Sequence, residues 1–350
     1  MTHDQAQERR NDYDVTNTVQ VSSPHQVRAA VASLFRSLYP RHSFDAVWLA
    51  FHDFERVFCG HDEYHPVDTP YHDIQHTLDM TLALARLIAG YESTAGPGDA
   101  LGPERAALAI VCGLFHDSGY LRHRERDRAV AHGAEFTRSH VSRSGQFLEG
   151  YLPRIGLGEF VPVAARIVHF TGYEIDIERI ELDEPKDSLV GHLLGTADLM
   201  AQLADRCYLE KCRDRLFPEF VVGGVALGES PSNARYRSGR DLLAKTLAFY
   251  QSSVRRRLEH NFNGAYRYME AYFEHGENPY VYFLRKNLAF LSTIIANGSW
   301  DRLRRKPPCV IPDASGEARL LRLAFERVRD WSEQKSGGVP SFAGLTAAAR

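Results

Sequence analysis

TPYHDIQHTLDMTLALARLIAGY, residues 69–91, combines an apolar pattern of helical period with two histidines that stand four residues apart. The apolar residues recur every three or four positions, which predicts a helix that continues to about residue 91. On such a helix His72 and His76 lie on one face, about 5–6 Å apart at their Cβ atoms. Both imidazoles can therefore face one site without binding the same atom.

Helical periodicity dominates the rest of the chain between residues 23 and 334, and strand or hairpin signals are scarce. We predict an all-α fold in one domain over these residues, flanked by polar tails at 1–22 and 335–350 that we expect to be mobile. The helix over 102–120 is expected to end at Gly119. The other segments expected to be helical are 25–39, 45–58, 132–152, 161–170, 187–209, 239–262 and 279–298.

The composition is that of a globular protein and points to no macromolecular partner. The 350 residues are 44% hydrophobic and 25% charged, with a formal net charge of −3, so no basic field favours nucleic acid or a membrane surface. No apolar run approaches the roughly 18 residues of a spanning helix, and the polar start MTHDQAQERRNDYDV lacks the apolar core of a signal peptide. The five scattered cysteines favour reduced thiols. We therefore expect a cytoplasmic protein, whose oligomeric state is left open.

Several of the expected helices carry a histidine or an aspartate inside an apolar run. They are His76, the pair His116 and Asp117 in GLFHDSGY, His169 in ARIVHFTGY and Asp198 in GTADLMAQL. An ionised aspartate in such a run costs several kcal/mol unless it is paired or binds a metal. Imidazole and carboxylate together suit zinc, iron, manganese and similar ions. The pattern therefore predicts a metal site shared by these helices.

The blocks YHDIQH, FHDSGY and TADLM together resemble those of the HD-domain metal-dependent phosphohydrolases, an all-helical superfamily. The first and last blocks are similar to those of the cyclic-nucleotide phosphodiesterases. The resemblance covers about residues 70–205, which we take as the metal-binding core of an HD-type bundle, with 206–334 as a C-terminal helical extension. It implies that a first divalent metal is held by His76, His116, Asp117 and Asp198, with Asp117 able to bridge to a second.

A second divalent metal needs further ligands. The phosphodiesterases have a histidine three residues after the His-Asp pair, whereas this chain has Tyr120 there. Other HD proteins, such as the HD-GYP phosphodiesterases and the mixed-valent di-iron oxygenases, take two histidines from the helices that follow. His140 and His169 match them in order, and His132 is the alternative to His140. The resemblance thus implies two metals, and Fe, Mn, Zn and Mg are not distinguished.

His72 precedes the ligand His76 by one helical turn. Two metals can make water a nucleophile for attack on a phosphoryl group, and the alkoxide that leaves needs a proton. The histidine at the matching position in the cyclic-nucleotide enzymes supplies that proton. We therefore assign His72 as general acid and Asp117 as the bridging catalytic carboxylate. The alternative is that His72 only makes a hydrogen bond near the helix start.

Four further residues are candidates for supporting roles. Asp73 stands where the cyclic-nucleotide enzymes carry asparagine, and Asp79 is placed to accept a hydrogen bond from an imidazole. Arg122 and Arg124, in LRHRERDR, are candidates for contacts to phosphate oxygens. A basic run of this kind is more often a solvated loop.

The function expected from this set is metal-dependent hydrolysis of a phosphodiester or phosphomonoester of a small nucleotide. A di-iron oxygenase is the alternative enzyme, because the same six-ligand arrangement activates dioxygen in other HD proteins. A nucleotide-binding sensor without turnover is the third candidate. His72 favours hydrolysis, since oxidative cleavage needs no acid for a phosphate-ester leaving group.

Overall fold

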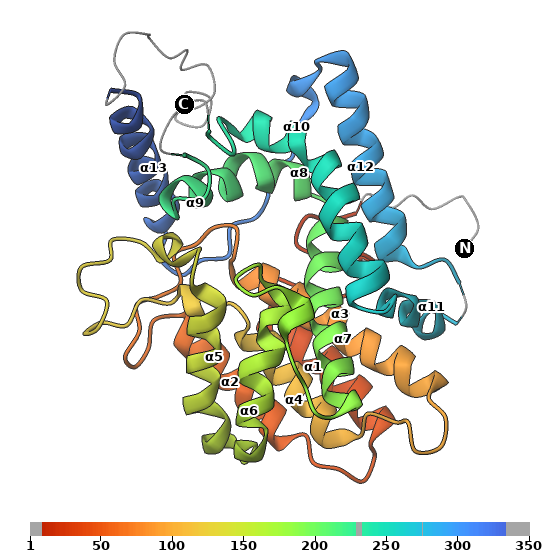
Figure 1. Ribbon diagram of the computed structural model, residues 1–350. Helices are drawn as coiled ribbons and strands as arrows, with labels where there is room; N and C mark the ends of the chain where they lie inside the picture. The colour runs from red at the N-terminus through yellow and green to blue at the C-terminus, as the bar shows by residue number, and fades with distance from the viewer. Residues whose placement is uncertain (1–8, 229–232, 275, 334–350) are drawn as a thin grey trace.

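The structure is a computed structural model that describes residues 9–228, 233–274 and 276–333. These residues fold into helices joined by loops. Extended segments of the described residues pair only at two isolated bridges, Tyr13 with Gln20 and Tyr64 with His123. The prediction of an all-α protein is therefore confirmed (Figure 1).

The helices of the described residues agree closely with the apolar periodicity of the sequence. They are α1 (Pro24–Leu38), α2 (Asp45–Phe58), α3 (Ile74–Thr94), α4 (Pro103–Phe115), α5 (His140–Tyr151), α6 (Val161–Ile167), α7 (Pro185–Ala204), α8 (Tyr208–Lys211), α9 (Phe217–Val222), α10 (Gly239–Phe249), α11 (Tyr268–Tyr272), α12 (Pro279–Asn297) and α13 (Gly316–Glu333). Of these, α9, α11 and α13 have no counterpart among the segments predicted to be helical.

Helix α3 lies at the centre of the molecule. Residues 74–90 of this helix are all buried, and it packs against α1, α4, α7 and α11. Helices α1 to α7 form the lower part of the molecule in Figure 1, and α8, α9, α10 and α13 lie above them. Helix α12 packs along α7, and α13 packs on α9. Buried apolar residues from Val15 to Ala324 form one continuous cluster, so the C-terminal helices share the core of the earlier ones.

Helix α4 ends earlier than the sequence predicts, at a position that matters for the site. It stops at Phe115, His116 and Asp117 follow it, and a 3-10 turn spans Ser118–Tyr120. Gly119 therefore does not end the helix. A Cβ atom at Gly119 would lie 1.8 Å from the carbonyl oxygen of His140, so glycine is required for the close approach of this turn to α5.

The segments predicted over 132–152 and 239–262 are each interrupted. In the first, a 3-10 turn at Gly133–Phe136 precedes α5. In the second, α10 passes into π-helical turns at Tyr250–Val254 and Arg257–Asn261. Such turns are rare and are often found at functional sites.

Residues 9–22 are packed against the helices, which corrects the prediction of a mobile tail up to residue 22. Val15 and Val21 are buried, and the Asp14 carboxylate lies 2.7 Å from the guanidinium of Arg86 on α3. Backbone amides of Thr16, Thr18 and Val19 also donate to this carboxylate. The remaining parts of the two predicted tails, 1–8 and 335–350, lie outside the described residues.

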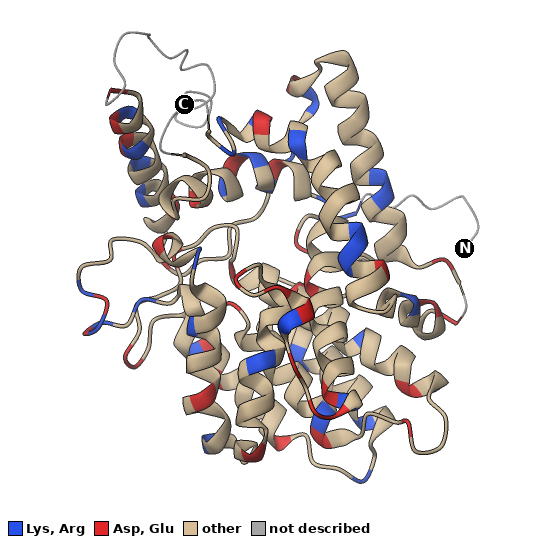
Figure 2. Ribbon diagram, in the orientation of Figure 1, with Lys and Arg blue, Asp and Glu red and all other residues tan. Residues whose placement is uncertain are grey.

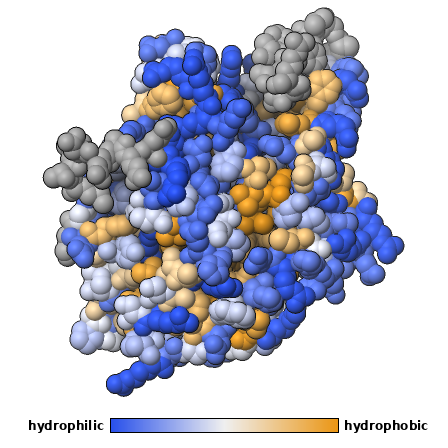
Figure 3. All heavy atoms as spheres, turned by 180° about the vertical axis from the view of Figure 1, so that it is seen from behind, coloured by the Kyte–Doolittle hydropathy of each residue, from blue (hydrophilic) through white to orange (hydrophobic). Residues whose placement is uncertain are grey.

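The surface shows charges of both signs between scattered apolar groups. Residues of both charge signs are spread over the helices in view, and neither sign covers a face (Figure 2). On the opposite face, the largest apolar group lies to the right of the centre among hydrophilic residues (Figure 3). Among the described residues, no helix combines the length and apolar character needed to cross a membrane. All five cysteines are unpaired.

Candidate metal centre

Three helices bring the predicted first-metal ligands to one buried point. His76 lies in the first turn of α3, His116 and Asp117 directly follow α4, and Asp198 lies in the second half of α7. All four side chains are buried. One ligand atom each from His76, His116 and Asp198 fall within 4.8 Å of one another, so these three residues could hold a metal ion.

Asp117 completes this cluster. The Nε2 atom of His76 lies 3.4 Å from Oδ2 of Asp117 and 3.3 Å from Oδ1 of Asp198. The Nε2 atom of His116 lies 3.1 Å from the same Oδ2 and 3.8 Å from the same Oδ1. The four residues singled out from the sequence are therefore brought together around one centre.

Neighbouring groups orient these side chains. The Nδ1–H of His116 donates to the carbonyl of Gly113 at 2.8 Å, which leaves the lone pair on Nε2 directed at the centre. The side-chain amide of Gln202 donates to Oδ1 of Asp198 at 2.6 Å. Asp73 caps α3 by accepting from the backbone N–H of His76 at 2.9 Å. Asp73 therefore supports a ligand through the backbone, and its other oxygen accepts from the Val310 N–H at 3.0 Å.

Two atoms of the cluster show that the donor set suits a cation. Nε2 of His116 and Oδ2 of Asp117 are fully buried, and neither has a hydrogen-bond partner among the described residues. Unsatisfied buried polar atoms are rare and costly in a folded protein. Burial alone would raise the pKa of Asp117, but the charges of His116 and His72 lower it well below its usual range. An anionic carboxylate beside an available imidazole nitrogen is the donor chemistry that divalent transition metals require.

His140 lies next to the other oxygen of Asp117. Its Nδ1–H donates to the Thr137 carbonyl at 2.9 Å, and its Nε2 lies 3.8 Å from Oδ1 of Asp117. The alternative, His132, has its Nδ1 occupied by the backbone N–H of Ala134 at 3.1 Å and closes the turn before α5. Of the two candidates, the structure places His140 at the cluster.

His169 is buried on the 3-10 turn Val168–Thr171, and its Nδ1 has no hydrogen-bond partner among the described residues. It lines a cavity of about 320 Å³ together with Arg166 and Arg179. No contact between His169 and Asp117 is found in the part of the chain that the structure describes. A second metal held by His140 and His169 thus stays a prediction.

His72 is held beside the cluster by an acidic residue that the sequence reading missed. Its Nδ1 lies 2.6 Å from Oε2 of Glu219 on α9, and the other oxygen of that carboxylate accepts from the backbone N–H of Tyr71 at 2.7 Å. Glu219 is fully buried. Its place between apolar residues in FPEFVV is the same kind of signal that identified Asp198, and it could have been found in that way.

Three rings pack against one another beside the cluster. The centroid of the Tyr120 ring lies 4.5 Å from that of His72 and 4.5 Å from that of His140, and the centroids of the two histidines are 6.0 Å apart. Tyr120 therefore packs against both His72 and His140 and restrains both rings. The centroids of His72 and His76 are 5.9 Å apart, but His72 precedes Asp73, the N-cap of α3, so the prediction that both lie on one helical face is wrong.

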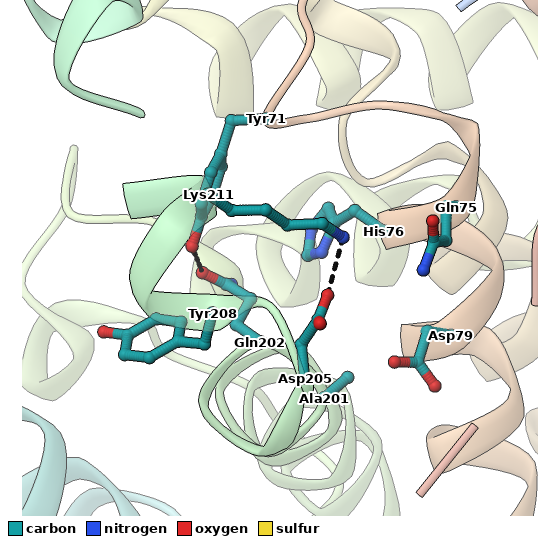
Figure 4. Close-up of a pocket in the computed structure, with 9 residues that line it drawn as sticks. All are labelled: Tyr71, Gln75, His76, Asp79, Ala201, Gln202, Asp205, Tyr208 and Lys211. Atoms are coloured by element: carbon teal, nitrogen blue, oxygen red, sulfur yellow. Dashed lines mark hydrogen bonds and ion pairs between the residues drawn. The ribbon is translucent and has the colours of Figure 1, made fainter. Parts of the chain in front are cut away.

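A small cavity behind His76 contains the second supporting aspartate. The cavity has a volume of about 10 Å³, enough for about one water molecule, and Figure 4 shows the side chains that line it. Lys211 pairs with Asp205 there at 2.6 Å. Asp79 is on the same wall, and its Oδ1 has no partner among the described residues. The expected hydrogen bond from an imidazole to Asp79 is therefore not formed at this oxygen.

The two arginines expected to contact phosphate are engaged by the protein itself. Arg122 pairs with the buried Asp68 at 3.0 Å and also donates to the Val130 carbonyl. Arg124 donates to the Gly60 carbonyl at 2.8 Å. These contacts give both side chains a role in holding loops, and a role in substrate binding stays a prediction.

The chain was compared with protein families, curated proteins and solved structures. No protein-family model matches the chain, and neither a curated protein nor a solved structure matches it.

Proposed function

We propose that this protein is a metal-dependent phosphohydrolase of the HD type that acts on a phosphodiester or phosphomonoester of a small nucleotide. The observation that carries the proposal is the hydrogen-bonded pair of His72 and Glu219 beside the buried cluster of His76, His116, Asp117 and Asp198. A proton donor next to a set of cation ligands is the combination that phosphate-ester hydrolysis needs.

The four clustered residues would hold the first cation, and His140 lies beside them, with its Nε2 3.8 Å from Oδ1 of Asp117. When bound, divalent cations polarise phosphoryl oxygens and activate water at neutral pH. The side chains are oriented in advance by Gly113, Gln202 and Asp73, so little reorganisation is needed when the site is filled.

His72 is the group that would transfer a proton to the leaving oxygen. Glu219 accepts a hydrogen bond from Nδ1 of His72 and does not engage Nε2. The Nε2 atom is therefore free to carry the proton that is transferred. The carboxylate fixes the orientation of the imidazole, and the stacked Tyr120 limits rotation of the ring. Glu219 acts through His72 and is a positioning residue.

The proposal is tested by hydrolysis of two ester series in metal-supplemented protein. We expect His72→Ala to slow hydrolysis of alkyl phosphodiesters, whose leaving groups need a proton, by about 10²- to 10⁴-fold. We expect a much smaller loss on p-nitrophenyl esters, because p-nitrophenolate leaves without protonation. The exposed His25→Ala variant should match the wild type on both series. An equal loss on both series would contradict the acid role of His72.

The same assay separates hydrolysis from the oxygenase alternative. Rates measured under nitrogen should equal those measured in air, because hydrolysis consumes no oxidant. Turnover that requires dioxygen, or that consumes it in proportion to product, would overturn the proposal in favour of a di-iron oxygenase.

A further inference from the structure

Arg257 is a buried cation without a carboxylate partner. The residue is only 7% exposed, and its Nη1 has no hydrogen-bond partner among the described residues. No ion pair of Arg257 occurs in the part of the chain that the structure describes. A buried guanidinium in this state costs several kcal/mol, unless an anion from outside the chain completes it.

The guanidinium is nevertheless held in a fixed position. Its Nη2 donates to the Gly172 carbonyl at 2.6 Å, and its carbon lies 3.6 Å from the centroid of the Tyr173 ring. Arg257 also opens the π-helical turn Arg257–Asn261. A carbonyl and an aromatic face orient the fork of N–H groups without neutralising its charge. This arrangement orders the side chain and leaves donors available.

The loop that holds Arg257 also borders the metal centre. Burial lowers its pKa, while the charges of Tyr173, Asp198 and Asp176 act to raise it. Asp198 is one of the clustered ligands, and it acts on the pKa of Tyr173 as well. The loop that holds Arg257 at Gly172 reaches the centre two residues further on, where Oε1 of Glu174 lies 3.8 Å from Nδ1 of His140. Arg257 is thus connected to the edge of the centre through this loop.

Tyr173 marks the side from which a ligand can reach the guanidinium. This residue is 55% exposed, although its ring is in contact with a buried cation. A Cβ atom at the preceding Gly172 would lie 2.4 Å from the Val141 side chain, so the loop is pressed closely onto α5. The tyrosine therefore stands at the boundary between solvent and the buried charge.

We infer that Arg257 is an anion-binding residue that receives the phosphoryl group of the ligand at the edge of the metal centre. A planar guanidinium with free N–H groups suits two oxygens of a tetrahedral oxyanion, and it has no internal carboxylate to displace. The identification of the anion as a phosphoryl group rests on the proposed function. The presence of an uncompensated buried cation does not depend on it.

The test measures binding of inorganic phosphate by the full-length, metal-loaded protein, without turnover. We expect Arg257→Met to raise the phosphate Kd about 10- to 100-fold, the loss that corresponds to a charge-assisted hydrogen bond. Arg257→Lys keeps the charge and loses the planar fork of N–H groups, so its phosphate Kd should lie between those of the wild type and Arg257→Met. Arg256→Met is the matched control, because Arg256 is the neighbouring residue, is 63% exposed at its side chain and pairs with Glu178 on the surface. This control should bind phosphate like the wild type.

Metal content and thermal unfolding are measured on the same samples, so that a misfolded variant is recognised. If Arg257→Met is misfolded, the phosphate Kd of Arg257→Lys decides the test. Wild-type affinity in both Arg257 variants, or an equal loss in Arg256→Met, would overturn the inference. Phosphate binding through Arg257 in a protein that hydrolyses no ester would refute the proposed function and leave the anion site standing. If Arg257→Met changes neither hydrolysis nor phosphate affinity, the anion site is refuted and the proposed function stands.

Discussion

Helix α3 buries charged groups at two places along its length, and the two places differ in how that charge is satisfied. Near its middle, the Arg86 guanidinium lies 2.7 Å from the Asp14 carboxylate and donates to the Tyr280 hydroxyl at 2.9 Å. At its first turn, His76 faces the cluster in which His116 Nε2 and Asp117 Oδ2 have no hydrogen-bond partner among the described residues.

The difference separates a structural role from a binding role. The pair of Arg86 and Asp14 neutralises itself and fastens residues 9–22 and α12 to α3. The cluster at His76 collects carboxylates and imidazoles, and two of its buried atoms have no hydrogen-bond partner among the described residues, which stabilises the fold little and suits a cation well. Substitutions in the two places should therefore have opposite effects on stability and on ligand binding.

The largest expected effect is on activity at the cluster. Asp117→Ala should lower the hydrolysis rate of p-nitrophenyl phosphate esters by about three orders of magnitude or more, because a ligand of the catalytic cation is lost. Its helical content by circular dichroism should stay that of the wild type. A variant that retains more than a tenth of the activity would remove Asp117 from the centre.

At the paired site the expected effect is on stability. Asp14→Ala should lower the free energy of unfolding by about 3–5 kcal/mol, because it leaves Arg86 buried without its counter-ion. Urea denaturation measures this loss. Asp12→Ala, at a partly buried position two residues away, should cost less than about 1 kcal/mol. Similar losses in both variants would mean that the ion pair does not hold residues 9–22.

A smaller effect is expected from Asp79, a buried carboxyl group of α3, and it depends on pH. Burial, together with the charges of Asp205 and Asp14, raises the pKa of Asp79 to about 7. The folded protein therefore holds a proton that the unfolded chain releases near pH 4, and the stability that this provides is present at low pH and lost as the pH rises through 7.

Asp79→Asn removes that dependence. Relative to the wild type, its free energy of unfolding should be higher at pH 8 than at pH 5 by up to a few kcal/mol, as measured by urea denaturation at both values. The exposed Asp99→Asn substitution serves as the control and should show no such difference. A constant difference between Asp79→Asn and the wild type at both pH values would contradict the raised pKa.

The smallest expected effect concerns protons displaced at the cluster. Burial would lower the pKa of His76, but the carboxylates of Asp117 and Asp198 raise it to about 10. A cation must therefore displace this proton, and its apparent affinity should increase about tenfold for each pH unit between 6.5 and 7.5. Competition with a chromophoric chelator measures the change. An affinity that is independent of pH would mean that His76 is not a ligand.

The sequence predicts those features whose signal is local. Helices α1, α2 and α12 could be placed because each buries a face of regular period, and His76, Asp117 and Asp198 are conspicuous because polar residues interrupt apolar runs. His72 could be paired with His76 because the two are four positions apart, although His72 lies just before α3.

The features that the sequence reading missed depend on contacts between distant segments. Glu219 meets His72 across 147 positions, Arg257 meets Gly172 across 85, and Arg86 meets Asp14 across 72. The spacing of apolar residues within one segment does not predict a contact between two distant segments. This is why residues 9–22 were expected to be mobile although Asp14 anchors them, and why the C-terminal extension gave no site residue.

The most direct test of the account is the metal content of protein purified without added metal and then exposed to Mn²⁺, Fe²⁺ or Zn²⁺ before desalting. The wild type and Asp79→Asn should retain the same stoichiometry of at least one of these ions, and Asp117→Ala and His116→Ala should retain little of it while remaining folded. Equal metal content in the wild type and both ligand variants would contradict a cation site at this cluster.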